Sequence, residues 1–220
     1  MGKHLLFIFL TLLSASVLMS SCKDDDGDEE EYANWQSRND AYFGSIRTLA
    51  LDSIRQAKTR YGNSWTAHCN WRSYLCYSLD STITNKSTDS IYVEIIRRGN
   101  GAGCPLSTDS CRLYYRGRLI PSASYPEGYV FDHTGQSSKF EKVFDHKTAV
   151  PGLIRPSTSV KGFGTALQNM HIGDLWRVYI PYTLGYNTAG SNSVPAYSTL
   201  IFEIELYAYY RSGVNVPVWH

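Results

Sequence analysis

Hydrophobic residues recur every three or four positions between residues 34 and 61, with charged residues between them. This spacing predicts an amphipathic helix over 34–61. Asn39 is a candidate N-cap near its beginning, and Gly62-Asn63 is a suitable stop. The apolar face consists of Trp35, Tyr42, Phe43, Ile46, Leu49, Ala50, Ile54 and Ala57. We expect this face either to pack on the domain that follows or to pair with a second copy of the chain as a homodimer.

From Ile91 onward the pattern changes to short runs rich in β-branched and aromatic residues, which predict strands. The predicted strands are 91–96, 111–115, 175–180 and 199–209. In the last of these, apolar residues occupy every second position from Leu200 to Ala208, and Glu203 and Glu205 lie on the other face. Such alternation is typical of an antiparallel strand with one buried face.

One short helix is predicted among these strands. Phe163, Leu167 and Met170 fall on one helical face, and Gly173 is suited to end the helix. An antiparallel sheet wrapped on one short helix is an α+β architecture. Residues 62–90, rich in Ser, Thr and Asn, are predicted to be a connector with some short structure. The expected organisation is a leader at 1–21, a tether at 22–33, a helical extension with its connector at 34–90, a main domain at 91–211 and a tail at 212–220.

The N-terminal segment indicates export. The apolar run from Leu5 to Met19 is shorter than the ~20 residues that a membrane-spanning helix needs. It ends in Ser20-Ser21-Cys22, which resembles the lipobox of bacterial lipoproteins, where the cysteine carries the lipid. The alternative is an ordinary secretory peptide with an incidental cysteine. We expect a signal peptide over 1–21 and lipidation at Cys22.

Acidic residues fill most positions after Cys22, from Asp24 to Glu31. Like charges repel and bury no apolar surface, so this tether should be extended. It either holds the folded part away from a membrane or directs the lipoprotein to the cell surface. We therefore expect an outer-membrane-anchored lipoprotein on the periplasmic or the cell-surface side.

The charge of the rest of the chain and its other cysteines bear on whether nucleic acid, disulfides or a metal are expected. Residues 32–220 contain 19 lysines and arginines against 13 aspartates and glutamates, without a basic run, so nucleic acid is not an expected partner. Four further cysteines in an exported chain predict disulfides, with three pairings open. We favour the local pairs Cys69–Cys76 and Cys104–Cys111. Their spacing does not match the Cys-x-x-Cys of zinc sites, so no metal is expected.

Seven motifs in the β-rich region, in order, resemble the FKBP family of peptidyl-prolyl cis-trans isomerases, from Ile91 to about Tyr210. They are Gly99-x-Gly101, Leu113-x-Tyr115-x-Gly117-x-Leu119, Gly128-x-x-Phe131-Asp132, Val160-Lys161-Gly162-Phe163, Leu167-x-x-Met170-x-x-Gly173-Asp174, Leu184-Gly185-Tyr186, and Val194-Pro195 leading to Phe202 and Glu205-Leu206. The resemblance implies an FKBP-like fold and a pocket that isomerises proline-containing polypeptides without a cofactor.

The resemblance also implies which residues form the apolar part of that pocket. Phe163 would be the floor on which a proline ring sits. Tyr115, Phe131 and Phe202 would form the walls, and Val194 would close one side.

Three further residues would supply polar groups, again by resemblance. The backbone N–H of Val160 would bind the carbonyl that precedes the proline. The hydroxyl of Tyr186 would donate a hydrogen bond to the peptide, and Asp132 would supply polarity beside the twisting bond.

The chain departs from the family pattern in places that bear on activity. Many members have Trp where this chain has Phe163, and Ser159 replaces an apolar residue. The segment 120–127 is longer than the usual turn. The segment 140–157 matches the family pattern poorly, so the residue that completes the pocket wall in this segment is not identified. Val150 is a candidate for it.

Three functions therefore remain open. The first is a membrane-tethered prolyl isomerase that helps exported proteins fold. The second is a catalytically weak or inactive binding module, and the third is a surface lipoprotein subunit of a nutrient-uptake complex. An open pocket with Asp132 and Tyr186 pointing inward favours the first, whereas a pocket filled by 120–127 or 140–157 favours the second.

Overall fold

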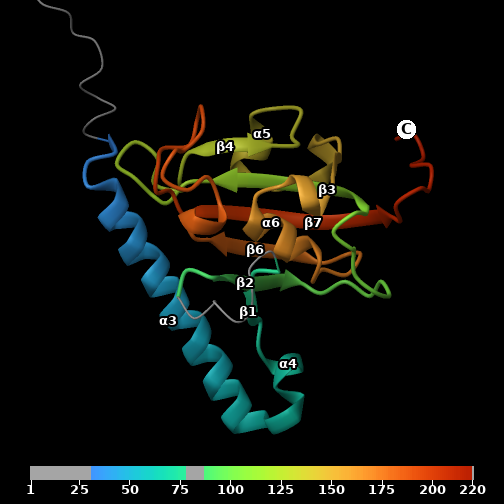
Figure 1. The fold of residues 1–220 in the computed structure, drawn as a ribbon, viewed down its shortest axis with the longest axis horizontal. Helices are drawn as coiled ribbons and strands as arrows, with labels where there is room; N and C mark the ends of the chain where they lie inside the picture. The colour runs from blue at the N-terminus through green and yellow to red at the C-terminus, as the bar shows by residue number, and fades with distance from the viewer. Residues whose placement is uncertain (1–30, 78–86, 220) are drawn as a thin grey trace, which may run out of the picture. The chain divides into compact units, whose positions relative to one another are not determined.

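One antiparallel sheet organises the chain from Asn34 onward, which forms a compact unit (Figure 1). The computed structural model describes residues 31–77 and 87–219. Its strands are β1 (Trp71–Leu75), β2 (Ser90–Arg97), β3 (Ser110–Arg118), β4 (Val130–His133), β5 (Gly152–Ile154), β6 (Leu175–Ile180) and β7 (Leu200–Tyr210). The order across the sheet is β1-β2-β6-β7-β3-β4, and β5 also pairs with β3. Every pairing is antiparallel, and the predicted α+β class is confirmed.

The helices are few. They are α3 (Trp35–Tyr61), α4 (Trp65–His68), α5 (Lys139–Lys142) and α6 (Lys161–Leu167), with 3-10 turns η1 (Gly62–Ser64), η2 (His146–Thr148), η3 (Pro156–Thr158) and η4 (Tyr182–Leu184). Within the described ranges, no helix is both long enough and apolar enough to cross a bilayer. The predicted signal peptide, Cys22 and nearly all of the acidic tether lie outside the described residues.

The hydrophobic core lies between the inner face of the sheet and α6. Four of the alternate residues of β7 that were predicted to be apolar, Leu200, Phe202, Ile204 and Leu206, are buried there with Phe163, Leu167 and Met170 of the α6 region, whereas Ala208 is only half-buried. A Cβ on Gly162 would lie 2.3 Å from a methyl of Ile180, so only glycine allows α6 to lie this close to β6. This close approach fixes the position of the residues at the beginning of α6.

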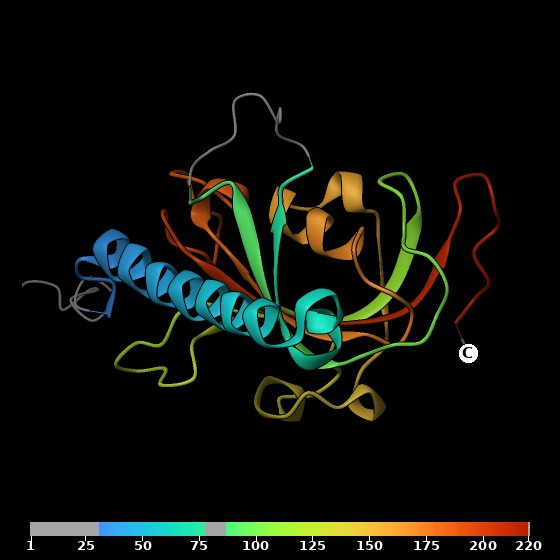
Figure 2. The same cartoon turned by 90° about the horizontal axis from the view of Figure 1, so that it is seen from below.

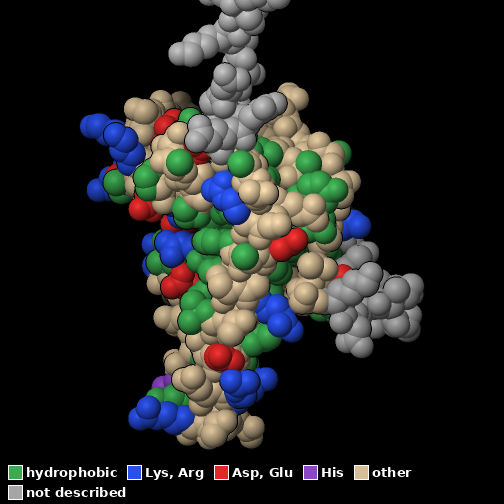
Figure 3. All heavy atoms as spheres, turned by 90° about the vertical axis from the view of Figure 1, so that its left-hand side faces the viewer, with side chains coloured by type: hydrophobic (Ala, Val, Ile, Leu, Met, Phe, Trp, Pro, Cys, Tyr) green, Lys and Arg blue, Asp and Glu red, His purple; other side chains and the backbone are tan. Residues whose placement is uncertain are grey.

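The outer face of the sheet is covered by other elements. Figure 2 shows α6 on one side of the sheet and the segment that contains α5 and η2 on the other. The helix α3 contacts β1 and β2, and its Phe43 ring lies 5.4 Å from that of Tyr92. On the face seen in Figure 3, lysines and arginines are dispersed among hydrophobic side chains instead of forming one patch.

The helix α3 has nearly the predicted bounds, but two of its residues behave differently. Asn34 is the N-cap, so the prediction for Asn39 was wrong; Asn39 lies inside the helix and is fully buried. Leu49, expected on the packing face, is 52% exposed. The helix docks on the sheet through a narrower stripe than the sequence indicated.

The strand predictions were confirmed for the long strands and incomplete for the short ones. The strand β1 lies in the segment predicted to be a connector, and pairs along its whole length with β2. The strands β4 and β5 both pair with β3. The helix α5 was also missed, and α6 ends at Leu167, before the expected stop at Gly173.

The predicted disulfides are not formed. Cys69 and Cys76 flank the extended strand β1, and seven extended residues span roughly 23 Å, far beyond the reach of a disulfide. Cys104 and Cys111 are free thiols. Burial raises the pKa of the Cys111 thiol to about 12, with a further contribution from Asp109, so this thiol is unreactive at neutral pH.

Candidate active site

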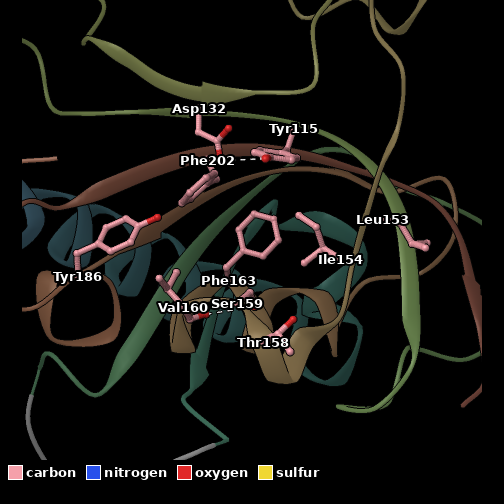
Figure 4. Close-up of a pocket in the computed structure, with 10 residues that line it drawn as sticks. All are labelled: Tyr115, Asp132, Leu153, Ile154, Thr158, Ser159, Val160, Phe163, Tyr186 and Phe202. Atoms are coloured by element: carbon pink, nitrogen blue, oxygen red, sulfur yellow. Dashed lines mark hydrogen bonds between the residues drawn. The ribbon is translucent and has the colours of Figure 1, made fainter. Parts of the chain in front are cut away.

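A cavity of about 390 Å³ opens between the beginning of α6, the inner face of β3 and β7, and the loop after η4 (Figure 4). It is lined by Tyr115, Asp132, Leu153, Ile154, Thr158, Ser159, Val160, Phe163, Tyr186 and Phe202. The lining is largely apolar, with a few polar groups at its rim. Such a composition is typical of a site that binds an apolar group in a defined orientation.

Three aromatic rings form the deep part of the cavity. Phe163 and Phe202 are packed edge to face with ring centroids 4.9 Å apart. The ring of Tyr115 lies 5.8 Å from Phe163 and 6.3 Å from Phe202. The edge-to-face contacts of Phe163 with both other rings, and the tilted contact between Tyr115 and Phe202, favour fixed ring angles and so define the shape of the cavity.

Gly117 allows two phenylalanine rings to pack over β3. A Cβ at this position would lie 2.6 Å from the ring of Phe202 and 2.7 Å from that of Phe131. Phe131 packs edge to face on Phe202, with centroids 5.5 Å apart. Phe131 therefore supports the wall formed by Phe202.

The polar rim is formed by two tyrosines and one carboxylate. The hydroxyl of Tyr115 donates a hydrogen bond of 2.9 Å to Oδ2 of Asp132. Burial raises the pKa of Tyr115, and the adjacent Asp132 raises it further; the pKa of Tyr186 is raised by the same two causes. Both hydroxyls therefore stay protonated and can donate hydrogen bonds at neutral pH. Figure 4 shows the hydroxyl of Tyr186 pointing into the cavity.

The backbone at the beginning of α6 forms the opposite side of the cavity. Val160 is the N-cap residue, and its carbonyl accepts the first helical hydrogen bond, from the N–H of Gly164. The hydroxyl of Ser159 donates to the carbonyl of Pro156, at 2.9 Å. Ser159, the residue that departs from the family pattern, thus closes the η3 turn just before α6. Within the described ranges, no three His, Cys, Asp or Glu side chains gather as a metal site would require.

Six of the eight residues expected in the pocket line this cavity. Phe131 and Val194 do not; Phe131 lies behind Phe202, and Val194 is 2% exposed. The candidate Val150 was wrong, because it is 46% exposed and absent from the lining.

The wall of the cavity for which the sequence indicated no reliable residue is formed by β5 and η3. Leu153, Ile154 and Thr158 line the cavity, and none of them was predicted. The signal that could have found them is the apolar pair Leu153-Ile154 shortly before Val160. Its position depends on the pairing of β5 with β3, which the sequence pattern does not disclose.

Comparison with known families agrees with this site. Residues 103–207 match the family model for FKBP-type peptidyl-prolyl cis-trans isomerases. This part of the chain is similar to an FKBP-type domain. The match covers β3 to most of β7 and leaves α3, β1 and β2 outside it.

Individual relatives resemble the same part of the chain. Macrophage infectivity potentiator of Trypanosoma cruzi is 36% identical over 122 residues, which are 55% of this chain and 54% of that protein. The FKBP-type 22 kDa peptidyl-prolyl cis-trans isomerase of Escherichia coli is 32% identical over 126 residues, 56% of this chain and 51% of that protein. The matched part thus spans about half the length of these relatives.

A solved structure is also similar. The peptidyl-prolyl cis-trans isomerase of Pseudomonas syringae has a TM-score of 0.45 and 22% identity, covering 76% of this chain and 96% of that one.

Proposed function

We propose that the FKBP-type domain accelerates cis-trans isomerisation of Xaa-Pro bonds in exported polypeptides and so helps them fold. The observation that carries this proposal is an open aromatic cavity with Tyr186 pointing into it and Asp132 at its rim. The activity needs no cofactor, because no bond is broken and no proton is transferred.

The chemistry fits the cavity. Rotation about the amide bond is opposed by loss of resonance, a barrier of about 18–20 kcal/mol. The twisted amide has less charge separation than the planar one and loses less on leaving water. An apolar cavity with hydrogen-bond donors in fixed positions can therefore bind the twisted form more tightly than the planar form, which lowers the barrier.

We assign roles to the lining on this basis. The ring of Phe163 supports the proline, and the backbone N–H of Val160 binds the carbonyl before it. The hydroxyl of Tyr186 donates to the peptide beyond the proline. Asp132 orients Tyr115 and supplies negative potential beside the twisting bond.

The arrangement favours an enzyme over an inactive binding module. Leu153 and Ile154, from the poorly matching segment, form a wall of the cavity and do not fill it. No residue of the long segment 120–127 is among the lining residues. A substrate proline therefore has room to enter.

The decisive experiment is the cis-to-trans rate of an Xaa-Pro-Phe peptide with the purified chain and two variants. Tyr186→Phe removes one neutral hydrogen bond, about 1 kcal/mol, and should lower kcat/KM by about fivefold. Asp132→Val removes a charged group, about 1.5–3 kcal/mol, and should lower kcat/KM by about ten- to hundredfold.

Tyr182→Phe is the matched control, because Tyr182 lies in the same loop but packs on Tyr197 outside the cavity. It should retain the full rate. No acceleration by the folded wild-type chain would refute the enzyme and leave a binding module.

We further propose that the chain is a lipoprotein of the cell envelope, anchored through Cys22, and that two copies pair through α3. One relative, from Legionella longbeachae, is named outer membrane protein MIP. The exposed Leu49 on α3 offers an apolar contact for pairing.

The Cys22→Ser variant tests the anchor. It should lose the lipid mass of the mature chain and leave the membrane fraction, since the lipid is the proposed attachment. Retention of the variant in the membrane at the wild-type level would contradict the anchor.

A further inference from the structure

Asn39 makes hydrogen bonds that helix formation does not require. It lies in the second turn of α3 with no exposed surface. Its Oδ1 accepts the backbone N–H of Thr199 at 2.7 Å, and its Nδ2 donates to the carbonyl of Trp35 at 2.8 Å. Thr199 directly precedes β7 and is 160 residues away in sequence. Docking of a helix needs only apolar contacts, so a buried amide with both ends bonded fixes one specific alignment.

The first residue of α3 makes a second tie to the same segment. The indole N–H of Trp35 donates to Oγ of Ser198 at 2.8 Å in a buried contact. The hydroxyl of Ser198 then donates to the carbonyl of Pro195 at 2.6 Å. The beginning of α3 therefore holds the backbone from Pro195 to Thr199, and Figure 1 shows the two segments side by side.

This held segment is bonded in turn to the residue after Tyr186. The N–H of Tyr197 donates to the carbonyl of Asn187 at 3.0 Å, and the N–H of Asn187 donates to the carbonyl of Tyr182. Tyr197 and Asn187 both adopt left-handed conformations, with φ of 62° and 56°. Such conformations are unfavourable for residues with a Cβ and persist only where the surrounding contacts hold them.

We propose that Asn39 and Trp35 are positioning residues for the isomerase site, because they hold the loop that places the hydroxyl of Tyr186. This inference rests on the proposed function. It means that α3, which lies outside the segment matched by the family model, completes the site. A misplacement of about 1 Å at a reacting group can cost about a hundredfold in rate, so a modest shift of the loop should be measurable.

The test compares Asn39→Ala and Trp35→Phe with the wild-type chain. Trp35→Phe keeps an aromatic ring at this position but removes the N–H donor to Ser198 together with the five-membered part of the buried indole. The first readout is kcat/KM for an Xaa-Pro-Phe peptide, which should fall in Asn39→Ala by up to about fivefold, the loss expected when the hydroxyl of Tyr186 is removed altogether. The second is the 19F resonance of Tyr186 in chain labelled with 3-fluorotyrosine, assigned by its loss in Tyr186→Phe. This resonance should shift in both variants.

A double variant separates positioning from general stability. If Asn39 acts through Tyr186, then Tyr186→Phe should cost much less in the Asn39→Ala background than in the wild-type chain. Phe43→Leu is the control on the same helix, because it weakens the packing of α3 on Tyr92 without touching Ser198 or Thr199. It should lower stability and leave both kcat and the Tyr186 resonance unchanged.

Each outcome bears on the proposal. An unchanged Tyr186 resonance and rate in folded Asn39→Ala and Trp35→Phe would overturn it, as would an equal effect of Phe43→Leu. A wild-type chain without isomerase activity would refute the proposed function alone, since the 19F comparison still decides whether α3 positions Tyr186. If Asn39→Ala fails to fold, Trp35→Phe decides the question with the same two readouts.

Discussion

Glu203→Gln is expected to lower the free energy of unfolding by about 3–5 kcal/mol at neutral pH, the cost of breaking a buried ion pair from one side. Glu203 lies on the outer face of β7 and is 6% exposed. Its carboxylate accepts hydrogen bonds from Arg116, through both Nε and Nη2, and from Nη2 of Arg177 at 3.1 Å. Glutamine has almost the same shape but would leave the buried Arg116 without its counter-charge.

The pH dependence of this effect follows from the pKa of Glu203. Burial alone would raise this pKa, but the charge and hydrogen bonds of Arg116, helped by Arg118 and Arg177, hold it below its ordinary value of 4.5. A lowered pKa in the folded state contributes stability above the unfolded pKa and loses it as the pH falls through the folded one. The difference between wild type and Glu203→Gln should therefore be full at pH 7 and shrink below about pH 4.5.

The free energy of unfolding would be measured by denaturant titration at pH 7 and pH 3.5 for the wild type, Glu203→Gln and Glu205→Gln. Glu205 is the matched control, since it lies two residues along the same face and pairs with the half-exposed Arg97. Such a pair contributes only about 0–1 kcal/mol. A loss below about 1 kcal/mol in Glu203→Gln, or a loss that does not depend on pH, would contradict the assignment.

The burial of Glu203 also shows which property of a strand residue the hydrophobic pattern does not predict, namely what covers it. The alternation along β7 correctly placed Glu203 opposite Phe202 and Ile204. It does not show that Arg116, 87 residues away in sequence, covers the carboxylate of Glu203 together with Arg177. A period of two identifies a face of a strand, but only the strand order decides what lies across from it.

The residues of the candidate site also fall into those that the sequence could predict and those that it could not. Tyr115, Asp132 and Phe163 could be expected in the cavity because each lies in a short motif that resembles the FKBP family. Ile154 could not, because it reaches the cavity through the pairing of β5 with β3 in a segment that departs from the family pattern. Asn39 has the residue type of a helix cap, and only the tertiary structure shows that its partner is Thr199.

Phe202→Ala should remove most of the isomerase activity that we propose. Phe202 is 4% exposed and contacts the rings of Phe131, Tyr115 and Phe163, so its loss opens the wall of the cavity and releases the other rings. Truncation of a buried phenylalanine costs about 3–5 kcal/mol of stability. We expect kcat/KM to fall by at least about a hundredfold, because the twisted amide would then meet a wider and wetter cavity.

Ile204→Ala distinguishes loss of the wall from loss of stability. Ile204 lies on the same inner face of β7, two residues along, and is fully buried, but it does not line the cavity. Its truncation should cost about 2–5 kcal/mol of stability, close to the cost in Phe202→Ala. Both variants would be assayed at a temperature where circular dichroism shows them folded. Equal activity in the two would mean that the ring of Phe202 serves the core alone, whereas a large deficit confined to Phe202→Ala would place that ring in the binding of the twisted amide.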